Sequence, residues 1–304
     1  MKEGSIMFQI VSDGSCDLTD KLLTIHQIHT VPFYITIDGK THQKEREELS
    51  VKDFYQYMVD HPDVFPKTSM PSIEDYVNCF EDILKQGQDI LCFTITTKFS
   101  GSYNSANSAK DILLEKYPER KIVIMDSTLA TVLQGLLVLE ACKLQQDNYS
   151  LEDAVNRLNQ LKSTGRIFFT VGNFEYLIHG GRIGKVAGVA AQTLGIRPII
   201  VMQEGEIFSK GVTRGRDKSK KKAIACAIDY LHSLNKTPDQ YSICVGYGYD
   251  KEEGEAFLSD LKTRLQETFP QYHDEIELFH IGATIGVHTG PYPIGLGIIE
   301  KVVI

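Results

Sequence analysis

The 304-residue sequence predicts an α/β protein with two domains. The first half alternates short apolar runs with longer amphipathic ones, the pattern of βαβ units that build a parallel sheet. The second half has strand-like runs on both sides of Glu204-Gly205, a turn typical of a hairpin, and predicts a mixed, largely antiparallel sheet. The length suits two domains of ordinary size. We therefore expect an α/β domain over residues 1–165 and an α+β domain over residues 166–304.

Local patterns predict each element of the first domain. Apolar runs indicate strands, and amphipathic runs that follow Ser, Asp or Gly indicate helices. Ser72-Ile-Glu-Asp75 has the form of a capping box, which starts a helix, and Asp38-Gly39 indicates a hairpin insertion. In chain order we expect strands at residues 8–11, 31–37, 90–96 and 122–125, and helices at residues 17–26, 50–60, 72–85, 102–116, from about 129, and 151–161.

The second domain is predicted in the same way. Gly180-Gly181 indicates the end of a helix and leaves Arg182 free for an ion pair. The glycine-rich stretch 286–291, which contains His288, indicates a loop. We expect strands at residues 167–171, 197–202, 207–212, 241–247, 276–281 and 296–303, and helices at residues 218–234 and 252–268.

Composition excludes several classes of protein. The net charge of −8 argues against a general nucleic-acid binder, which needs a basic face. The six cysteines form no C-x-x-C pair, so zinc ribbons and thioredoxin-type chemistry are not expected, and scattered thiols fit a reducing cytoplasm. No apolar run reaches the length that spans a bilayer. We expect a cytoplasmic protein with no stable membrane insertion.

Hydroxyl side chains gather at the predicted carboxyl ends of the parallel strands, where open α/β sheets bind ligands. They occur in Asp13-Gly14-Ser15, Ser100-Gly101-Ser102 and Asp126-Ser127, and Thr68–Ser72 precedes a helix that can reach the same edge. Hydroxyls and backbone N–H groups at helix starts suit an anionic oxygen ligand such as a carboxylate or phosphate. The alternative is that each Ser or Thr caps its own helix.

Nucleotide and hydrolase motifs are absent. The segment Gly180–Lys185 resembles a P-loop but has His179 where the first Gly is needed and Val186 where Ser or Thr is needed. There is no G-x-S-x-G elbow and no H-E-x-x-H motif in the sequence. The most basic segment contains Arg214 and Arg216, which either begin a solvated helix or contact an anion.

An ordered series of short motifs resembles the DegV family over nearly the whole chain. The run Ser12-Asp-Gly-Ser-Cys-Asp17 resembles its S-D-x-x-x-D opening, Thr68-Ser-Met-Pro-Ser72 its T-S-x-P-S, and Phe99-Ser-Gly-Ser-Tyr103 its S-G-[ST]-Y motif. The segments that follow in the family's order are Asp126-Ser127, Leu177-Ile-His-Gly-Gly-Arg-Ile183, Arg197-Pro-Ile199 and His288-Thr-Gly-Pro291.

The resemblance implies a fatty acid bound between an α/β and an α+β domain, in a carrier rather than an enzyme. It implies that Thr68 and Ser100 bind the carboxylate, while Arg214 and His288 face the phosphate and a separate ATP-dependent fatty acid kinase. It implies no cofactor and no metal, only the lipid as ligand. Accessory residues implied by the same motifs are Ser69, Gly101, Ser127, Arg182, Arg216 and Thr289.

Two departures from the family pattern affect these roles. Tyr292 stands where the family commonly has Gly, and the segment around Arg214 matches loosely, so Arg216 is an alternative for its role. With the ordinary histidine pKa of about 6.5, the charged form of His288 favours a phosphate. Two further functions remain open: a small-molecule transferase that uses His288 and Asp126, and a regulatory module that senses a lipid.

Overall fold

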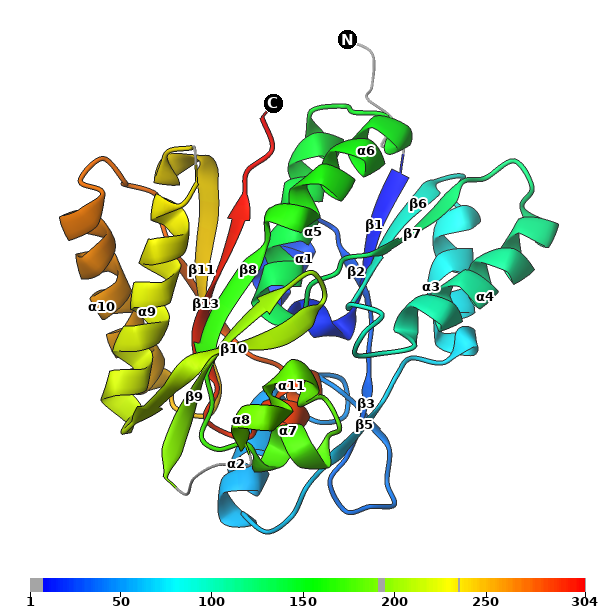
Figure 1. The fold of residues 1–304 in the computed structure, drawn as a ribbon. Helices are drawn as coiled ribbons and strands as arrows, with labels where there is room; N and C mark the ends of the chain where they lie inside the picture. The colour runs from blue at the N-terminus through cyan, green and yellow to red at the C-terminus, as the bar shows by residue number, and fades with distance from the viewer. Residues whose placement is uncertain (1–7, 191–194, 235, 304) are drawn as a thin grey trace.

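Two large β-sheets stand side by side in the computed structural model, which describes residues 8–190, 195–234 and 236–303 (Figure 1). The first sheet has the order β2-β1-β6-β7, and all of its neighbouring strands run parallel. Its strands are β1 (Phe8–Asp13), β2 (His29–Val31), β6 (Asp89–Thr94) and β7 (Ile122–Asp126). The predicted parallel sheet of the N-terminal half is confirmed.

Six helices lie in the described part of the first half of the chain. They are α1 (Asp20–Ile25), α2 (Val51–Asp60), α3 (Ile73–Leu84), α4 (Ser102–Lys116), α5 (Thr131–Gln146) and α6 (Leu151–Leu161), with one 3-10 turn at Gly14–Cys16. The predicted capping box is present, because Ser72 accepts from the Asp75 amide while Asp75 accepts from the Ser72 amide. Two N–H groups at the start of α3 are satisfied in this way.

The run predicted as one strand over residues 31–37 divides into two elements. Val31 ends β2 in the parallel sheet, and β3 (Tyr34–Thr36) begins a separate small sheet of order β4-β3-β5, with β4 (Gln43–Lys44) and β5 (Lys67–Ser69). Pro32 lies at the break and has no N–H group with which to continue a ladder. The small sheet positions the site, because β5 pairs Thr68 with Ile35.

The second sheet has the order β10-β9-β8-β13-β11-β12 and is antiparallel except for the β11/β12 pair. Its strands are β8 (Arg166–Thr170), β9 (Ile196–Gln203), β10 (Glu206–Arg214), β11 (Tyr241–Tyr247), β12 (Glu277–His280) and β13 (Ile294–Glu300). Glu204 and Gly205 both have positive φ, as the predicted two-residue hairpin turn requires. The mixed, largely antiparallel sheet is confirmed.

The helices of the second half are α7 (Glu175–His179), α8 (Ala187–Ala190), α9 (Arg216–His232), α10 (Lys251–Thr268) and α11 (Ala283–Thr289), with 3-10 turns at Lys162–Thr164, Gly184–Val186 and Pro238–Gln240. His288 belongs to α11, so the prediction that it lies in a loop was wrong. Gly282 caps α11, and Gly290 ends it at a φ of 77°. The flanking glycines therefore mark the ends of a short helix, and His288 projects from its last turn.

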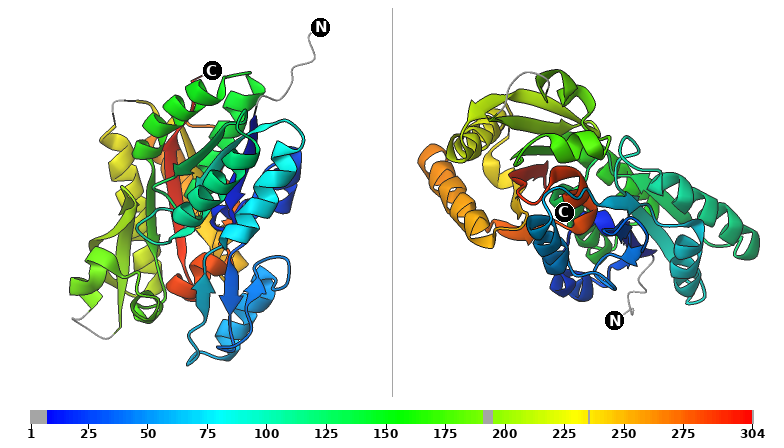
Figure 2. Two further views of the ribbon diagram at one scale, coloured as in Figure 1. Left: turned by 90° about the vertical axis from the view of Figure 1, so that its right-hand side faces the viewer. Right: turned by 90° about the horizontal axis from the view of Figure 1, so that it is seen from below.

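Helices and sheets alternate in layers across the molecule. α9 and α10 cover the outer face of the second sheet, α3 and α4 cover the first, and α5 packs between them, as Figure 1 and the right-hand view of Figure 2 show. The largest apolar cluster joins α5 to inner-face residues of both sheets.

All strands of the first sheet precede residue 127 and all strands of the second follow residue 165. The domain boundary near residue 165 remains a prediction. Within the described ranges, no helix is long and apolar enough to cross a membrane.

A buried carboxylate ties the ends of the parallel strands to two helices. Asp13, at the end of β1, accepts from the Ile95 amide at 2.8 Å, the Ser102 hydroxyl at 2.8 Å, the Gln134 side-chain amide at 2.9 Å and the Ser15 hydroxyl at 2.7 Å. These donors come from β6's end, α4, α5 and the turn after β1. Asp13 thereby fixes the loop that precedes α4.

Replacement of Asp13 by Ala should lower the free energy of unfolding by about 3 kcal/mol, because several buried donors lose their acceptor. Urea unfolding followed by circular dichroism measures this. Asp111→Ala, which removes an exposed carboxylate from α4, the helix that Asp13 contacts through Ser102, is the control and should change stability by less than about 0.5 kcal/mol. Equal stability of the two variants would contradict the structural role of Asp13.

Candidate ligand-binding pocket

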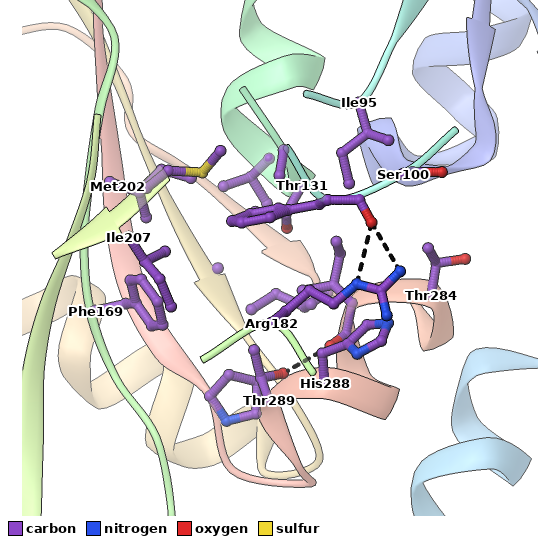
Figure 3. A pocket seen from close by; sticks show the side chains of 18 of the residues that line it. Ile95, Ser100, Thr131, Phe169, Arg182, Met202, Ile207, Thr284, His288 and Thr289 are labelled. Carbon is purple, nitrogen blue, oxygen red and sulfur yellow. Dashed lines mark hydrogen bonds between the residues drawn. The ribbon is translucent and has the colours of Figure 1, made fainter. Parts of the chain in front are cut away.

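A cavity of about 270 Å³ lies between the two sheets, and side chains from both halves of the chain form its wall (Figure 3). Most of the lining is apolar. Ile95, Phe169, Met202 and Ile207 are among these side chains, and the last three lie together on the second-sheet side. An apolar wall interrupted by few polar groups is typical of a small-molecule site.

Polar groups gather on the side opposite Phe169, Met202 and Ile207. Thr68 comes from β5, Ser100 from the loop before α4, and His288 from α11. The Thr68 hydroxyl lies 3.2 Å from Nε2 of His288, across 220 positions of sequence. The structure therefore brings together three of the four residues predicted for the head group of a ligand.

The loop before α4 shapes this end of the cavity. The Ser100 hydroxyl accepts from the Ser102 amide at 3.2 Å, and Ser102 is itself held by Asp13. A Cβ at Gly101 would lie 2.8 Å from Sδ of Met70, so a larger residue at this position would displace the Met70 side chain. Met70 is 45% exposed and lies where the cavity meets the surface.

Arg182 is the cation at this end of the cavity. Its guanidinium donates to the carbonyl of Phe99 from Nε at 3.1 Å and from Nη2 at 2.9 Å, and to the carbonyl of Gly180 at 2.7 Å. Within the described ranges no carboxylate lies at ion-pair distance from it, so the predicted ion pair of Arg182 is not formed. The carbonyl oxygens orient the Arg182 guanidinium without neutralising its positive charge, and an anionic ligand would supply the negative charge that pairs with it.

His288 is neutral at pH 7. Burial lowers its pKa to about 4, and the positive charge of Arg182 contributes to the shift. The expectation of an ordinary histidine pKa was wrong, because the side chain lies inside the wall and not in a solvated loop. Its Nδ1 is buried without a partner among the described residues. A neutral imidazole offers one donor and one acceptor, and Thr68 uses one of them.

Of the remaining predicted residues, some line the cavity and others do not. Gly101 and Thr289 line the cavity. Ser69 is exposed, whereas Ser127 is buried in a turn, where its hydroxyl bonds to the backbone of Leu129. Ser127 does not line the cavity, and it does not cap α5 either, because the N-cap residue of that helix is Ala130.

The two other arginines lie outside the cavity lining. Arg214 is exposed at the end of β10. Arg216 begins α9 and makes two hydrogen bonds to Glu253, at 2.8 Å and 2.6 Å. Tyr292 is 39% exposed and packs edge-on against Tyr249, so the departure from the family's Gly faces the surface.

Sequence reasoning missed some of the wall. Thr131 and Thr284 line the cavity, although neither belongs to a motif that indicated a ligand. Arg182 was named only as an accessory residue. The sequence signal that could have indicated Arg182 is the Gly180-Gly181 pair directly before it. In the structure a Cβ at Gly180 would overlap the His288 ring, so this glycine lets the chain pass close to α11.

Comparison with known proteins agrees with this fold. A family model described as "Uncharacterised protein, DegV family" matches residues 7–301. A DegV domain-containing protein of Clostridium acetobutylicum is 30% identical over 293 residues, which cover 96% of this chain and 98% of that protein.

Two solved structures have the same fold. A stearic acid-binding protein from Eubacterium ventriosum matches with a TM-score of 0.91 and 44% identity, covering 97% of this chain and 99% of that one. A DegV family protein from Thermus thermophilus, described by its fatty acid binding, matches with a TM-score of 0.85 and 25% identity over 97% and 99% of the two chains. The protein studied here belongs to the DegV family.

Proposed function

We propose that this protein binds a long-chain fatty acid and presents its carboxylate to a separate ATP-dependent kinase, which forms the acyl phosphate. The single observation that carries the proposal is the unneutralised guanidinium of Arg182 at one end of an otherwise apolar cavity. Such a cavity suits a ligand with one anionic end and a long apolar body. The E. ventriosum relative, which binds stearic acid, supports this choice of ligand.

The acyl chain supplies most of the affinity. A C16 chain buries roughly 15 methylene and methyl groups at about 0.8 kcal/mol each, on the order of 12 kcal/mol before the cost of association. Each head-group hydrogen bond adds about 1–3 kcal/mol. The side chains Phe169, Met202 and Ile207 offer the tail an apolar surface. The cavity volume of about 270 Å³ lies just below the range for ligand pockets, about 300–1,000 Å³.

The head group fixes the direction of the ligand. In the proposed pose the carboxylate accepts from the hydroxyls of Ser100 and Thr68 and pairs with Arg182. Because His288 is neutral, it adds no second charge to this end, and it holds the Thr68 hydroxyl across the cavity. A carboxylate so placed lies near the exposed Met70, from which a partner protein can reach it.

The arrangement favours a carrier over a transferase. Asp126, the acid that a transferase would pair with His288, bonds instead to the Thr97 hydroxyl at 2.7 Å and the Thr128 amide at 2.8 Å. It is not among the residues that line the cavity. No Asp or Glu appears in that lining, so the described part of the cavity holds no acid–base pair. Phosphoryl transfer then requires a second protein, and the exposed Arg214 is proposed to contact that partner.

The proposal is tested by the lipid itself. Denaturing the purified protein and analysing the extract by mass spectrometry should release a fatty acid in a stoichiometric amount. Titration of the delipidated protein with C14 to C18 acids should show saturable binding of one molecule per chain, since the proposal assigns the acid to this one apolar cavity. Neither bound lipid nor binding of added acid would refute the proposed function.

Ser100→Ala and Thr68→Ala should each weaken fatty-acid binding by about 1–2 kcal/mol, because each removes one donor to the carboxylate and leaves the tail contacts unchanged. Isothermal titration of the delipidated variants measures the effect. Ser69→Ala removes an exposed hydroxyl from the next position in β5 and serves as the matched control, with unchanged affinity. An unaltered affinity in the Ser100/Thr68 double variant would place the head group elsewhere.

His288→Ala and Arg214→Ala should retain fatty-acid binding within about tenfold, roughly 1.4 kcal/mol, because neither residue is needed to bury the tail. Both should lose acyl-phosphate formation when a cognate kinase and ATP are supplied. Arg264→Ala removes an exposed arginine from α10 and is the control for Arg214. Full acyl-phosphate yield from the double variant would refute these roles, and loss of lipid binding alone would make the residues structural.

A further inference from the structure

Two carboxyl groups lie buried together behind the wall of the pocket. Asp17 follows the turn after β1 and is 5% exposed, and Glu45 follows β4 and is 3% exposed. A Cβ at Gly282 would overlap an oxygen of each carboxyl group, so both face the same backbone position at the start of α11. Neither residue lines the cavity, and the proposed function uses neither.

Glu45 holds the start of α11. Its carboxylate accepts from the amide of Ala283, from the amide of Thr284 at 3.2 Å and from the hydroxyl of Thr284. Since α11 spans only Ala283–Thr289, a side chain that binds its first two amides determines where the whole helix sits.

Asp17 holds the start of α5 in a similar way. Its carboxyl group accepts from the Thr131 hydroxyl at 2.5 Å. Asp17 and Thr131 both have a φ of 51°, in the left-handed region that side chains other than those of Gly, Asn and Asp seldom adopt. At Thr131 such a conformation persists only where surrounding contacts stabilise it, and the hydrogen bond to Asp17 is one of these contacts.

The two carboxyl groups thereby organise one side of the pocket. Thr131 and Thr284 line the cavity, and each commits its hydroxyl proton to one member of the pair. The same short helix carries His288, whose ring reaches Thr68 on the small sheet. Movement of the start of α11 would therefore displace polar residues of the head-group end together.

The pair has few opposing charges. The titratable groups that face it or line its surroundings are Asp13 and Cys16 near β1, Arg46 after β4, Tyr55 of α2, Tyr247 of β11, His280 of β12 and His288 of α11. Arg46 is the cation nearest to both, and its guanidinium pairs with the exposed Asp20 at 3.0 Å. Two buried carboxyl groups with so little compensation cannot both ionise without repelling each other.

The position of the proton follows from the hydrogen bonds. Glu45 accepts three donors, which stabilise its ionised form, although burial still raises its pKa. Burial and then the charge of Glu45 raise the pKa of Asp17 to about 8, and they outweigh the hydrogen bonds that Asp17 accepts from the Thr131 hydroxyl and the Gly282 backbone amide, which lower it. Asp17 is the member that keeps a proton at neutral pH.

We propose that Asp17 and Glu45 are positioning residues that share one proton, and that this singly protonated pair holds α11 and Thr131 in the arrangement that binds ligand. The inference rests on the proposed function for one of its readouts, ligand affinity. Loss of the proton places two negative charges against Gly282 and loosens the start of α11.

The direction of the pH effect follows from the shift. The folded-state pKa of Asp17 lies above the ordinary aspartate value of 3.8, so the folded protein holds the proton more tightly than the unfolded chain. The stabilisation of the folded state by this proton is complete below about pH 4 and is lost as the pH rises to about 8. At pH 9 about one tenth of the molecules keep the proton, so the apparent dissociation constant should be about tenfold higher than at pH 7.

Fatty-acid affinity at pH 7 and pH 9 tests the proposal in three variants. Asp17→Asn carries a permanent amide donor in place of the proton and still accepts from Thr131, so it should bind equally at both pH values. Asp17→Ala offers neither group and should bind at least about tenfold more weakly at both. Glu140→Gln changes a carboxyl group that is buried against Lys143 and the backbone amide of Val302, and should keep the wild-type pH profile.

An affinity of the wild type that is equal at pH 7 and pH 9 would overturn the proposal, as would an Asp17→Asn variant that binds as weakly as Asp17→Ala.

Hydrogen exchange measured without ligand distinguishes failure of this positioning proposal from failure of the proposed function. At pH 9 the amides of Ala283–Thr289 should exchange faster in the wild type than in Asp17→Asn, and at equal rates in the wild type and Glu140→Gln. Equal exchange in all three would refute the positioning role even if fatty acid binds. The predicted exchange difference without any lipid binding would refute only the proposed function.

Discussion

Burial of α5 on both of its long sides is the constraint on which the rest of the structure depends. Most of its 16 residues are buried, and one apolar cluster joins them to the first sheet through Phe93 and to the second through Ile200. A Cβ at Gly135 would overlap the Cys16 carbonyl, so the helix also lies against the turn after β1. Since α5 starts at Thr131 in the pocket wall, the packing that joins the sheets also sets the cavity between them.

The fold was largely predictable where a periodic pattern extends over many residues. The bounds of α4 and α6 agree with the sequence prediction, and α6 begins at the side-chain cap of Ser150, a signal that is local in sequence. Shorter elements were missed. α11 has seven residues between glycines, and β5 has three, so neither carries a recognisable period. Both are stabilised by contacts with distant segments, such as the Glu45 cap and the β3 partner, which no local window contains.

The site was predictable only in part. The motifs that named Thr68, Ser100 and His288 identified residues that do meet in the cavity. Their chemical state could not be inferred, because the pKa of His288 depends on burial and on Arg182, which lies 106 positions away in sequence. The importance of Arg182 itself depends on the carbonyls that orient it, and the sequence cannot show which backbone groups those are.

The position of β13 has a consequence for how the protein is made. It is the last strand described, yet it lies in the middle of the second sheet, between β8 and β11. Ribosomal synthesis therefore delivers the two flanking strands before the strand that pairs with both. Until residues 294–300 emerge, β8 and β11 each present an open edge that can pair with another chain. Ile294 and Gly295 also line the cavity, so the wall of the cavity is incomplete until these residues have been synthesised.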